Sequence, residues 1–372
     1  MKSAIDPRRT VRLFFGPQHP GVTGNMSVEL WVDGDEVTKA VTHVGYLHRA
    51  FEKLMEQRLW IQNFPLVCRI CVPEPDINEA CYARAVEELA GIEIPPRAQW
   101  IRVLVLELAR LGVNLMALGG QGGTIGLGTA GQWGITYRDF VLDLFEELSG
   151  GRIYHMYIQP GGVRRDLPTG FFKRIDRVLE TIEERLTEFD RLLFDNEVFH
   201  SRTRGIGYIP DAWVDELNLV GPVARACGFP RDVRKDDPYE IYDTLDFDIV
   251  TEEGGDVYAR AVVRRRDIDL SMSLIRQIMD RMPTGPISVS LPNLTRWRVP
   301  PGEVYTKVES ARGEYGYYVV SDGGLKPRRV HVRGPSYVHG VTLLERMLVG
   351  ANIADVSNIM VSLTICPPEI ER

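Results

Sequence analysis

The sequence predicts a mainly helical α+β fold, with a helical core and flanking antiparallel strands. Three features lead to this prediction: apolar–polar alternation near the N-terminus, long segments of helical periodicity, and strand-like segments around a glycine turn near the C-terminus. The 372 residues contain no repeat, low-complexity segment or clear linker. We therefore expect a single unit over 1–372, with an N-terminal β-hairpin part (1–50), a helical core (51–195) and a mixed part (196–372).

The first predicted element is a β-hairpin. Met26–Val32 alternates between apolar and polar side chains, Asp33-Gly34-Asp35 is a turn signal, and Glu36–Val44 returns along the first strand. A helix is then predicted from Asp76, because an acidic N-cap followed three residues later by Glu79 is the pattern of a capping box.

Periodicity predicts the remaining helices. They are Arg97–Leu118, Tyr137–Leu148, Thr169–Phe194 and Asp267–Met282. Gly, Pro and Asp make the region 198–258 irregular in pattern. Strands are predicted at Val304–Val320 and Arg328–Val332, around the turn Ser321–Gly324.

Composition excludes several classes of function. A formal net charge of -7 argues against a general nucleic-acid binder. No signal peptide is visible, and the longest uncharged run, 111–137, is interrupted by nine glycines, so it does not supply a membrane span. Five unevenly spaced cysteines do not form a secreted disulfide framework, so we expect a reducing, cytoplasmic environment.

One glycine pattern invites a nucleotide-binding interpretation. Gly126-Leu-Gly128-Thr-Ala-Gly131 matches GxGxxG, but that motif works only when a strand precedes it and a helix follows. Here a predicted helix precedes it. We expect a flexible glycine loop that ends this helix.

The pair Cys68 and Cys71, in Val-Cys-Arg-Ile-Cys-Val, has several possible roles. A zinc site needs four ligands, and an iron–sulfur cluster usually takes four cysteines. A dithiol redox site needs only two, one of them with a depressed pKa, and both the predicted helix start at Asp76 and the side chain of Arg69 favour a thiolate. A role as small buried apolar side chains stays open.

Several motifs together resemble one family over essentially the whole chain. The sequence resembles the 49-kDa (D) subunit of respiratory complex I, which is itself similar to the large subunit of membrane-bound [NiFe] hydrogenases. The motifs that carry this resemblance are Gly16–Pro20, Val44–Lys53, Arg84–Arg97, Pro160–Val163, Asp166–Pro168, Asp232–Lys235, Glu309–Gly316 and Pro368–Arg372. The resemblance implies the hydrogenase-large-subunit-like fold and a place in a membrane-anchored respiratory complex.

The departures from this family bear on the metal centre. In hydrogenases two cysteine pairs hold nickel and iron, and the corresponding positions here are Cys71 and Glu74, and Cys366 and Glu369. Two of the four thiolates are therefore carboxylates, whereas soft thiolate ligands select such a centre. We expect no [NiFe] centre and no other metal bound by this chain.

The quinone site of the family is changed as well. The resemblance places His19 at one quinone ligand, but Thr23 and Val72 stand where complex I subunits carry a second histidine and a tyrosine. Neither residue donates protons as those side chains do. The chain thus resembles the family fold without either of its known chemistries.

The remaining pattern resembles the archaeal membrane-bound sulfane sulfur reductase, most closely its L subunit. This resemblance implies reduction of polysulfide, with Cys68, Cys71 and Arg69 as catalytic residues. The expected substrate pocket comprises His19, Thr23, Val72, Glu74, Cys366 and Glu369.

The expected assembly is a ferredoxin-driven, ion-pumping complex at the cytoplasmic face of the membrane. Its partners would be a small iron–sulfur subunit holding [4Fe–4S] clusters, other hydrophilic-arm subunits and antiporter-like membrane subunits. Two alternatives remain: a quinone or methanophenazine reductase subunit, and a non-catalytic coupling subunit.

Overall fold

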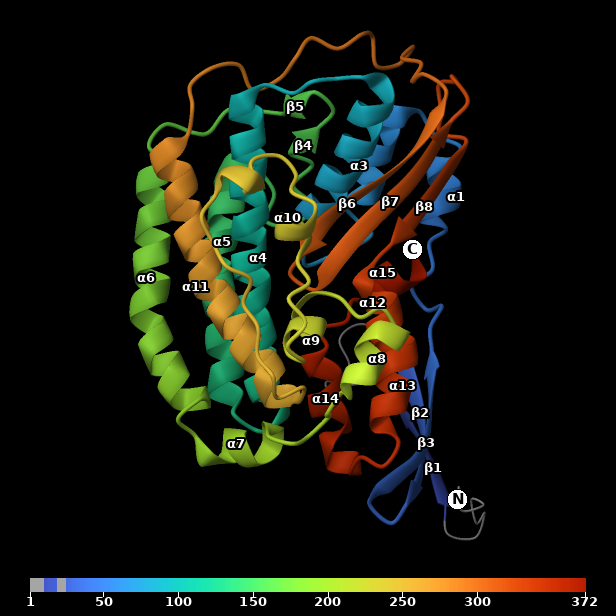
Figure 1. Ribbon diagram of the computed structural model, residues 1–372, viewed down its shortest axis with the longest axis vertical. Coiled ribbons are helices and arrows are strands. Elements are labelled where there is room, and N and C mark those ends of the chain that lie inside the picture. The colour runs from blue at the N-terminus through green and yellow to red at the C-terminus, as the bar shows by residue number, and fades with distance from the viewer. Residues whose placement is uncertain (1–9, 19–24) are drawn as a thin grey trace.

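Two three-stranded antiparallel sheets lie beside a group of long helices in the computed structural model, which describes residues 10–18 and 25–372 (Figure 1). This arrangement confirms the predicted mainly helical α+β class. The N-terminal sheet contains β1 (Thr10–Phe15), β2 (Ser27–Asp33) and β3 (Glu36–His43) in that order. The predicted hairpin is β2–β3, and β1 adds a third strand that the alternation did not indicate.

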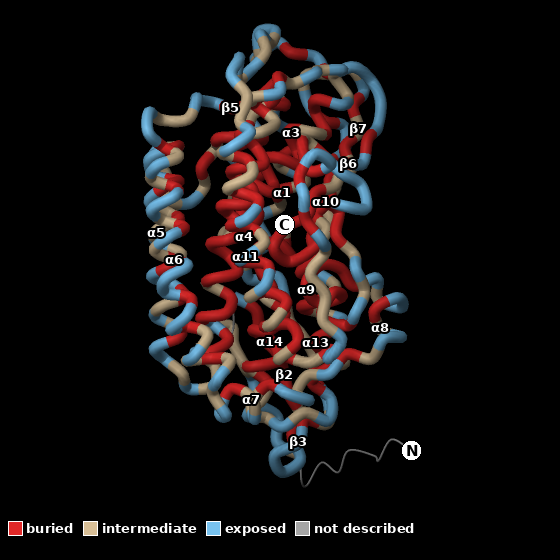
Figure 2. Tube along the Cα trace, turned by 60° about the vertical axis from the view of Figure 1, so that its left-hand side comes forward, coloured by how far each residue is buried: buried red, intermediate tan, exposed pale blue. Residues whose placement is uncertain are grey.

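The long helices form the second layer. They are α3 (Pro75–Ala90), α4 (Pro96–Thr124), α5 (Gly128–Ser149), α6 (Phe171–Leu193) and α11 (Val257–Arg281). Figure 2 shows that buried segments gather along α4, which packs against α3, α5 and α11. The helix predicted from Asp267 begins ten residues earlier in the structure, because the side chain of Asp256 caps it by accepting a hydrogen bond from the Ala259 N–H.

The glycine pattern at 126–131 is only partly a loop. Gly126 has φ of 91° and turns the chain after α4, but Gly128–Gly131 already belongs to α5. Further along these helices, a Cβ at Gly119 would lie 2.9 Å from the Cα of Gly134, so bare backbone lets α4 and α5 approach closely. The expected loop from 126 to 131 is therefore wrong beyond Leu127.

The C-terminal sheet contains one turn that the sequence did not predict. It contains β6 (Gly302–Ser310), β7 (Gly313–Ser321) and β8 (Arg329–Arg333). The segment predicted as one strand, 304–320, folds back on itself, with Ser310 paired to Gly313 across Ala311 and Arg312. This short turn is central to the site described below.

Short elements complete the chain. The helices are α1 (Phe51–Met55), α2 (Phe64–Val67), α7 (Glu197–Thr203), α8 (Asp211–Glu216), α9 (Gly221–Arg225), α10 (Val233–Asp236), α12 (Pro335–Tyr337), α13 (Leu344–Leu348), α14 (Val356–Ser362) and α15 (Pro367–Glu371). The 3-10 turns are Trp60–Asn63, Tyr242–Thr244 and Ile353–Asp355, a π-helical turn covers Val338–Leu343, and the two-stranded ribbon is β4 (Ile158–Gln159) with β5 (Gly162–Val163).

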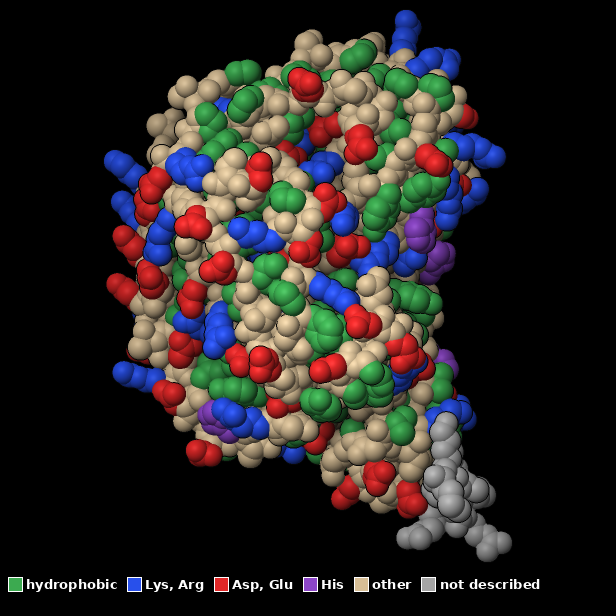
Figure 3. Space-filling view, in the orientation of Figure 1, with side chains coloured by type: hydrophobic (Ala, Val, Ile, Leu, Met, Phe, Trp, Pro, Cys, Tyr) green, Lys and Arg blue, Asp and Glu red, His purple; other side chains and the backbone are tan. Residues whose placement is uncertain are grey.

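The surface carries charged side chains of both signs, and the interior is mainly apolar. Figure 3 shows acidic and basic side chains interspersed over the face in view, and the described residues of that face form no continuous basic patch. Within the described ranges, no helix has both the length and the apolar character needed to cross a bilayer. The larger apolar core lies among the long helices and the C-terminal sheet, and a second core joins the N-terminal sheet to α13 and α14.

Candidate functional site

The Cys-x-x-Cys segment follows a helix of one turn. Cys68 is the C-cap of α2, and Cys71 lies three residues later on the chain that leads into α3. Both side chains are fully buried, whereas Arg69 between them is partly exposed. The two thiols therefore lie just beneath a surface that Arg69 helps to form.

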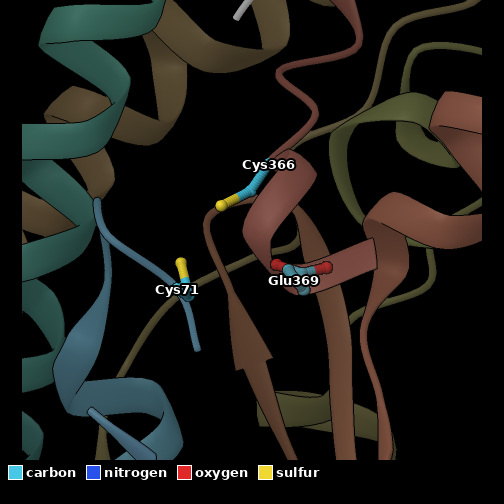
Figure 4. A group of neighbouring side chains, drawn as sticks. All are labelled: Cys71, Cys366 and Glu369. Atoms are coloured by element: carbon cyan, nitrogen blue, oxygen red, sulfur yellow. The ribbon is translucent and has the colours of Figure 1, made fainter. Parts of the chain in front are cut away.

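Cys366 comes to Cys71 from the opposite end of the chain. It precedes α15, and its sulfur, the Cys71 sulfur and a carboxylate oxygen of Glu369 all lie within 4.8 Å of one another. Figure 4 shows both sulfur atoms pointing into the space between the segment around Cys71 and the start of α15. The cysteine placed beside Cys71 in this group is thus Cys366, which the sequence assigned only to the pocket wall.

Arg312 organises this cluster from the turn between β6 and β7. Its Nη2 donates to Cys71 Sγ at 2.7 Å and lies 3.1 Å from Glu74 Oε2 and 3.0 Å from Glu369 Oε2. The guanidinium and both carboxylates are at most 1% exposed. One buried cation therefore holds a thiol and two carboxylates in a fixed arrangement.

Backbone groups orient the two carboxylates. Glu74 Oε1 accepts a hydrogen bond from the Ala311 N–H at 2.8 Å, and Glu369 Oε1 accepts one from the Ser336 N–H at 2.8 Å. Each carboxylate thus accepts a backbone hydrogen bond with one oxygen and forms an ion pair with Arg312 through the other. The arrangement ties together segments from the start of α3, the β6–β7 turn and the last helix of the chain.

The electrostatics favour one thiolate in the Cys71–Cys366 pair. A hydrogen bond from the Cys71 thiol and the positive charge of Arg312 lower the pKa of Cys366 to about 7, against the opposing effect of burial. Burial, followed by the neighbouring Cys366, raises the pKa of Cys71 well above its usual value. Near neutral pH a substantial fraction of the pair therefore carries one proton, with the thiolate on Cys366 and the thiol on Cys71.

Cys68 has a different environment. Burial raises the pKa of Cys68 to about 12, although Arg69 Nη1 donates to its sulfur at 3.2 Å. The same Arg69 nitrogen donates to the Pro65 carbonyl at 2.6 Å and contacts Met156 Sδ at 3.9 Å. The expectation that the helix start and Arg69 depress the pKa of Cys71 is wrong, because burial outweighs them and Arg312 is the cation that touches Cys71.

The predicted capping box at the start of α3 is also wrong. The helix begins at Pro75, with Glu74 at the N-cap position and no side-chain cap. Asp76 instead binds His155 and Glu79 binds backbone N–H groups of 156–158, because both carboxylates are buried against that loop.

The remaining predicted residues are placed as follows. Val72 lies half-buried beside Cys71, and Glu74 and Glu369 contact Arg312, as described above. His19 and Thr23 lie outside the described residues.

Sequence reasoning missed three site residues. They are Arg312, Arg49, which donates to the Arg69 carbonyl at 2.9 Å, and Tyr154, whose ring lies 5.1 Å from the Arg69 guanidinium carbon. Arg49 and Arg312 belong to motifs that carry the family resemblance, so those motifs were the available signal.

The donor set does not fit a nickel–iron centre. Two of the four positions implied by the resemblance are carboxylates, and the Arg312 guanidinium lies within hydrogen-bonding distance of Cys71, Glu74 and Glu369. The Arg312 guanidinium thus neutralises the negative charge of these groups, as a bound metal cation would otherwise do.

Comparisons with known proteins point to one family. Residues 124–296 and 294–372 match the family described as respiratory-chain NADH dehydrogenase, 49 Kd subunit. The D subunit of NADH-quinone oxidoreductase from Thermosipho melanesiensis is 49% identical over 364 residues, which cover 97% of this chain and 99% of that protein. The D subunit of the F(420)H(2) dehydrogenase from Methanosarcina mazei is 38% identical, covering 96% of each chain.

A solved structure is similar over the full length. It is a chain in the structure of the membrane-bound sulfane sulfur reductase, an archaeal respiratory membrane complex, and it is 48% identical in sequence with a TM-score of 0.95. The similarity covers 100% of both chains. The relatives named in these comparisons are thus subunits of respiratory oxidoreductase complexes.

Proposed function

Because the chain belongs to the family of the 49-kDa subunit of respiratory-chain NADH dehydrogenase, we propose that it is the acceptor-reducing subunit of a respiratory membrane complex and that its acceptor is sulfane sulfur. The observation that carries this proposal is the buried Cys71–Cys366 pair held on Arg312. The full-length similarity to a chain of the sulfane sulfur reductase complex supports it.

The chemistry begins with the thiolate shared by Cys71 and Cys366. It attacks a sulfane sulfur of a polysulfide, so a cysteine–sulfur bond forms and the shortened polysulfide leaves with the electron pair of the broken bond. The second thiol then attacks the cysteine sulfur of this persulfide, releasing hydrosulfide and leaving a Cys71–Cys366 disulfide. Two electrons and one proton then restore the starting pair, with one sulfur as a thiol and the other as a thiolate.

Those electrons require a donor outside this chain. A [4Fe–4S] cluster in a small iron–sulfur subunit, reduced ultimately by ferredoxin, would supply them. We place this subunit peripherally on the cytoplasmic face of the membrane, with other hydrophilic-arm subunits and antiporter-like membrane subunits as further partners. Arg69, which donates to the Cys68 sulfur, and Arg49, which donates to the Arg69 carbonyl, form a positively charged surface at the Cys-x-x-Cys segment. Such a surface suits an anionic polysulfide chain.

The test uses single variants of the purified complex. We expect Cys71→Ala and Cys366→Ala to abolish polysulfide reduction while the complex remains assembled. Cys227→Ala is the matched control, because Cys227 is also buried but belongs to the second apolar core. Full activity of both site variants would falsify the thiol mechanism.

A Cys68→Ala variant separates two versions of the mechanism. If Cys68 is needed and Cys366 is not, the working pair is Cys68 with Cys71, as the sequence predicted. If Cys366 is needed and Cys68 is not, the working pair is the one that the structure brings together.

A quinone-type acceptor is the second candidate. The name of the Thermosipho melanesiensis relative, at 49% identity, is the observation that favours it. This candidate predicts that the purified complex reduces a quinone or methanophenazine and that quinone-site inhibitors block it. The half-buried Val72, beside Cys71, argues against it because valine offers no proton.

A further inference from the structure

The loop from Arg152 to Ile158 contains two unusual backbone conformations. Tyr154 has φ of 61° and Met156 has φ of 47°, so both lie in the left-handed region. Side chains with a Cβ rarely adopt this region, and bulky ones least of all. Such residues persist only where the surroundings hold them, and they cluster at functional sites.

A buried carboxylate holds this loop in place. Glu79 Oε1 accepts a hydrogen bond from the Met156 N–H at 2.7 Å, and Glu79 Oε2 accepts from Tyr157 N–H at 2.8 Å and Ile158 N–H at 2.9 Å. Glu79 lies on α3 and is fully buried. Three consecutive backbone N–H groups donate to the one Glu79 carboxyl group, and these hydrogen bonds fix the course of the loop.

A second contact holds the centre of the loop. His155 Nδ1 lies 2.9 Å from Asp76 Oδ1, and its ring stacks on the Phe145 ring at 4.0 Å between centroids. Asp76 is fully buried and His155 nearly so. Because His155 points into the protein, its neighbours Tyr154 and Met156 are presented on the other side.

That other side faces Arg69, the residue that covers Cys68. The Tyr154 ring lies 5.1 Å from the Arg69 guanidinium carbon, and Met156 Sδ lies 3.9 Å from Arg69 Nη1. Burial raises the pKa of Tyr154, against the opposing positive charges of Arg49 and Arg69. The phenol therefore stays protonated at neutral pH and remains a hydrogen-bond donor.

We propose that Tyr154 is a catalytic residue of the sulfur site, whose phenol donates a hydrogen bond to the leaving sulfur of a polysulfide bound against Arg69. The proposal rests on the sulfane-sulfur function proposed above. In this proposal Tyr154, which lies on a different segment of the chain, supplies the hydrogen-bond donor that Val72 cannot supply. Glu79 is a positioning residue that acts through the loop.

The step involves no net gain or loss of electrons. A cysteine thiolate forms a bond to an inner sulfur, the S–S bond beyond that sulfur breaks, and its electron pair goes to the leaving sulfur. Negative charge therefore develops on the leaving sulfur as the bond breaks. The Tyr154 O–H meets that charge while the proton stays on the phenol, as donors do in an oxyanion hole.

The experiment compares Tyr154→Phe with wild type in the purified complex, using two trisulfides that differ only in the leaving thiol. One releases an alkyl thiolate and the other a nitroaryl thiolate, which delocalises its own charge. Phenylalanine keeps the ring against Arg69, so the loop should hold. The matched control is Tyr258→Phe, because Tyr258 is likewise half-buried beneath a guanidinium, that of Arg204 at 4.0 Å, but lies away from the thiols.

We expect Tyr154→Phe to lower kcat on the alkyl trisulfide by about 100-fold, the usual effect of losing one donor to a developing anion. The loss on the nitroaryl trisulfide should be less than about 5-fold, since that leaving group needs the donor less, and KM should change little. Tyr258→Phe should stay within about twofold of wild type on both.

Equal activity of Tyr154→Phe and wild type would overturn the role of Tyr154 and leave the thiol mechanism intact. An equal loss on both trisulfides would also overturn it, because a purely structural defect does not depend on the leaving group. A wild-type complex that reduces neither trisulfide nor inorganic polysulfide would remove the proposed function itself, and this inference with it.

Discussion

Replacing Arg312 with methionine is expected to suppress the thiolate at the centre of the site. The Arg312 Nη2 atom lies 2.7 Å from Cys71 Sγ and 3.1 Å and 3.0 Å from carboxylate oxygens of Glu74 and Glu369. Methionine keeps an unbranched apolar chain but removes the charge. The Cys366 thiolate then loses the nearby positive charge, so we expect the pKa of Cys366 to rise.

The size of the effect follows from the pKa of Cys366. That pKa is about 7, lowered by the hydrogen bond from Cys71 and by Arg312 against the effect of burial. A return to the usual value of about 8.5 would reduce the thiolate fraction at pH 7 from about one half to about 3%, a change of about 2 kcal/mol in its ionisation. Removing one partner of a buried ion pair also costs about 3–5 kcal/mol of stability.

The assay is the pH dependence of Cys366 alkylation by iodoacetamide in the complex, followed by mass spectrometry of the peptide. Arg312→Met should shift the midpoint upward by at least 1 pH unit and slow labelling about 15-fold at pH 7. Arg225→Met is the matched control, because Arg225 forms an equally buried pair with Asp267 at 2.7 and 2.9 Å. An unchanged Cys366 midpoint in Arg312→Met would refute the assignment of Arg312 as the stabilising cation.

Three further predictions concern stability. Asp76→Asn should destabilise the chain most near pH 5 to 6 and progressively less as the pH rises. Burial lowers the pKa of His155, but the neighbouring Asp76 raises it above its usual value of 6.5. The stabilisation from this pair is therefore complete below pH 6.5 and is lost as the pH rises through the raised pKa of His155. Urea unfolding at several pH values measures this, and a pH-independent loss would contradict it. Gly334→Ala should lower the free energy of unfolding by about 1–3 kcal/mol and disturb the site, since the added Cβ would lie 2.3 Å from Glu369 Oε1. An unchanged unfolding midpoint would show instead that the Glu369 side chain moves aside without loss of stability. Leu111→Ala, in the fully buried centre of α4, should cost about 3–5 kcal/mol through the cavity it leaves, without changing the alkylation of Cys366.

The sequence was informative where structure depends on local pattern. The long helices α4 and α6 and the hairpin β2–β3 lie close to where periodicity and turn signals predicted them. Motifs along the chain also indicated the family, which the comparisons then confirmed.

Predictions failed where a buried partner from elsewhere in the chain overrides local preference. Asp76 and Glu79 read as a helix cap, but buried contacts with the loop at 152–158 use both carboxylates. The segment 304–320 was predicted as one strand because Ala311 and Arg312, the two central residues of its turn, are not typical turn residues, although Ser310 and Gly313 on either side of them are.

The sequence by itself determined the helical core, the flanking strands and the family. It also placed Cys71 and Cys366 at positions that the resemblance to hydrogenases assigns to metal ligands. Only the tertiary structure decided that these two sulfurs lie together, that Arg312 holds them, and that Tyr154 stands over Arg69. Periodicity and turn propensity act over a few neighbouring residues, so they can be read along the chain. The pairing of buried charges and thiols is decided by packing between distant segments, because each buried polar group must find its partner wherever the fold brings one within reach.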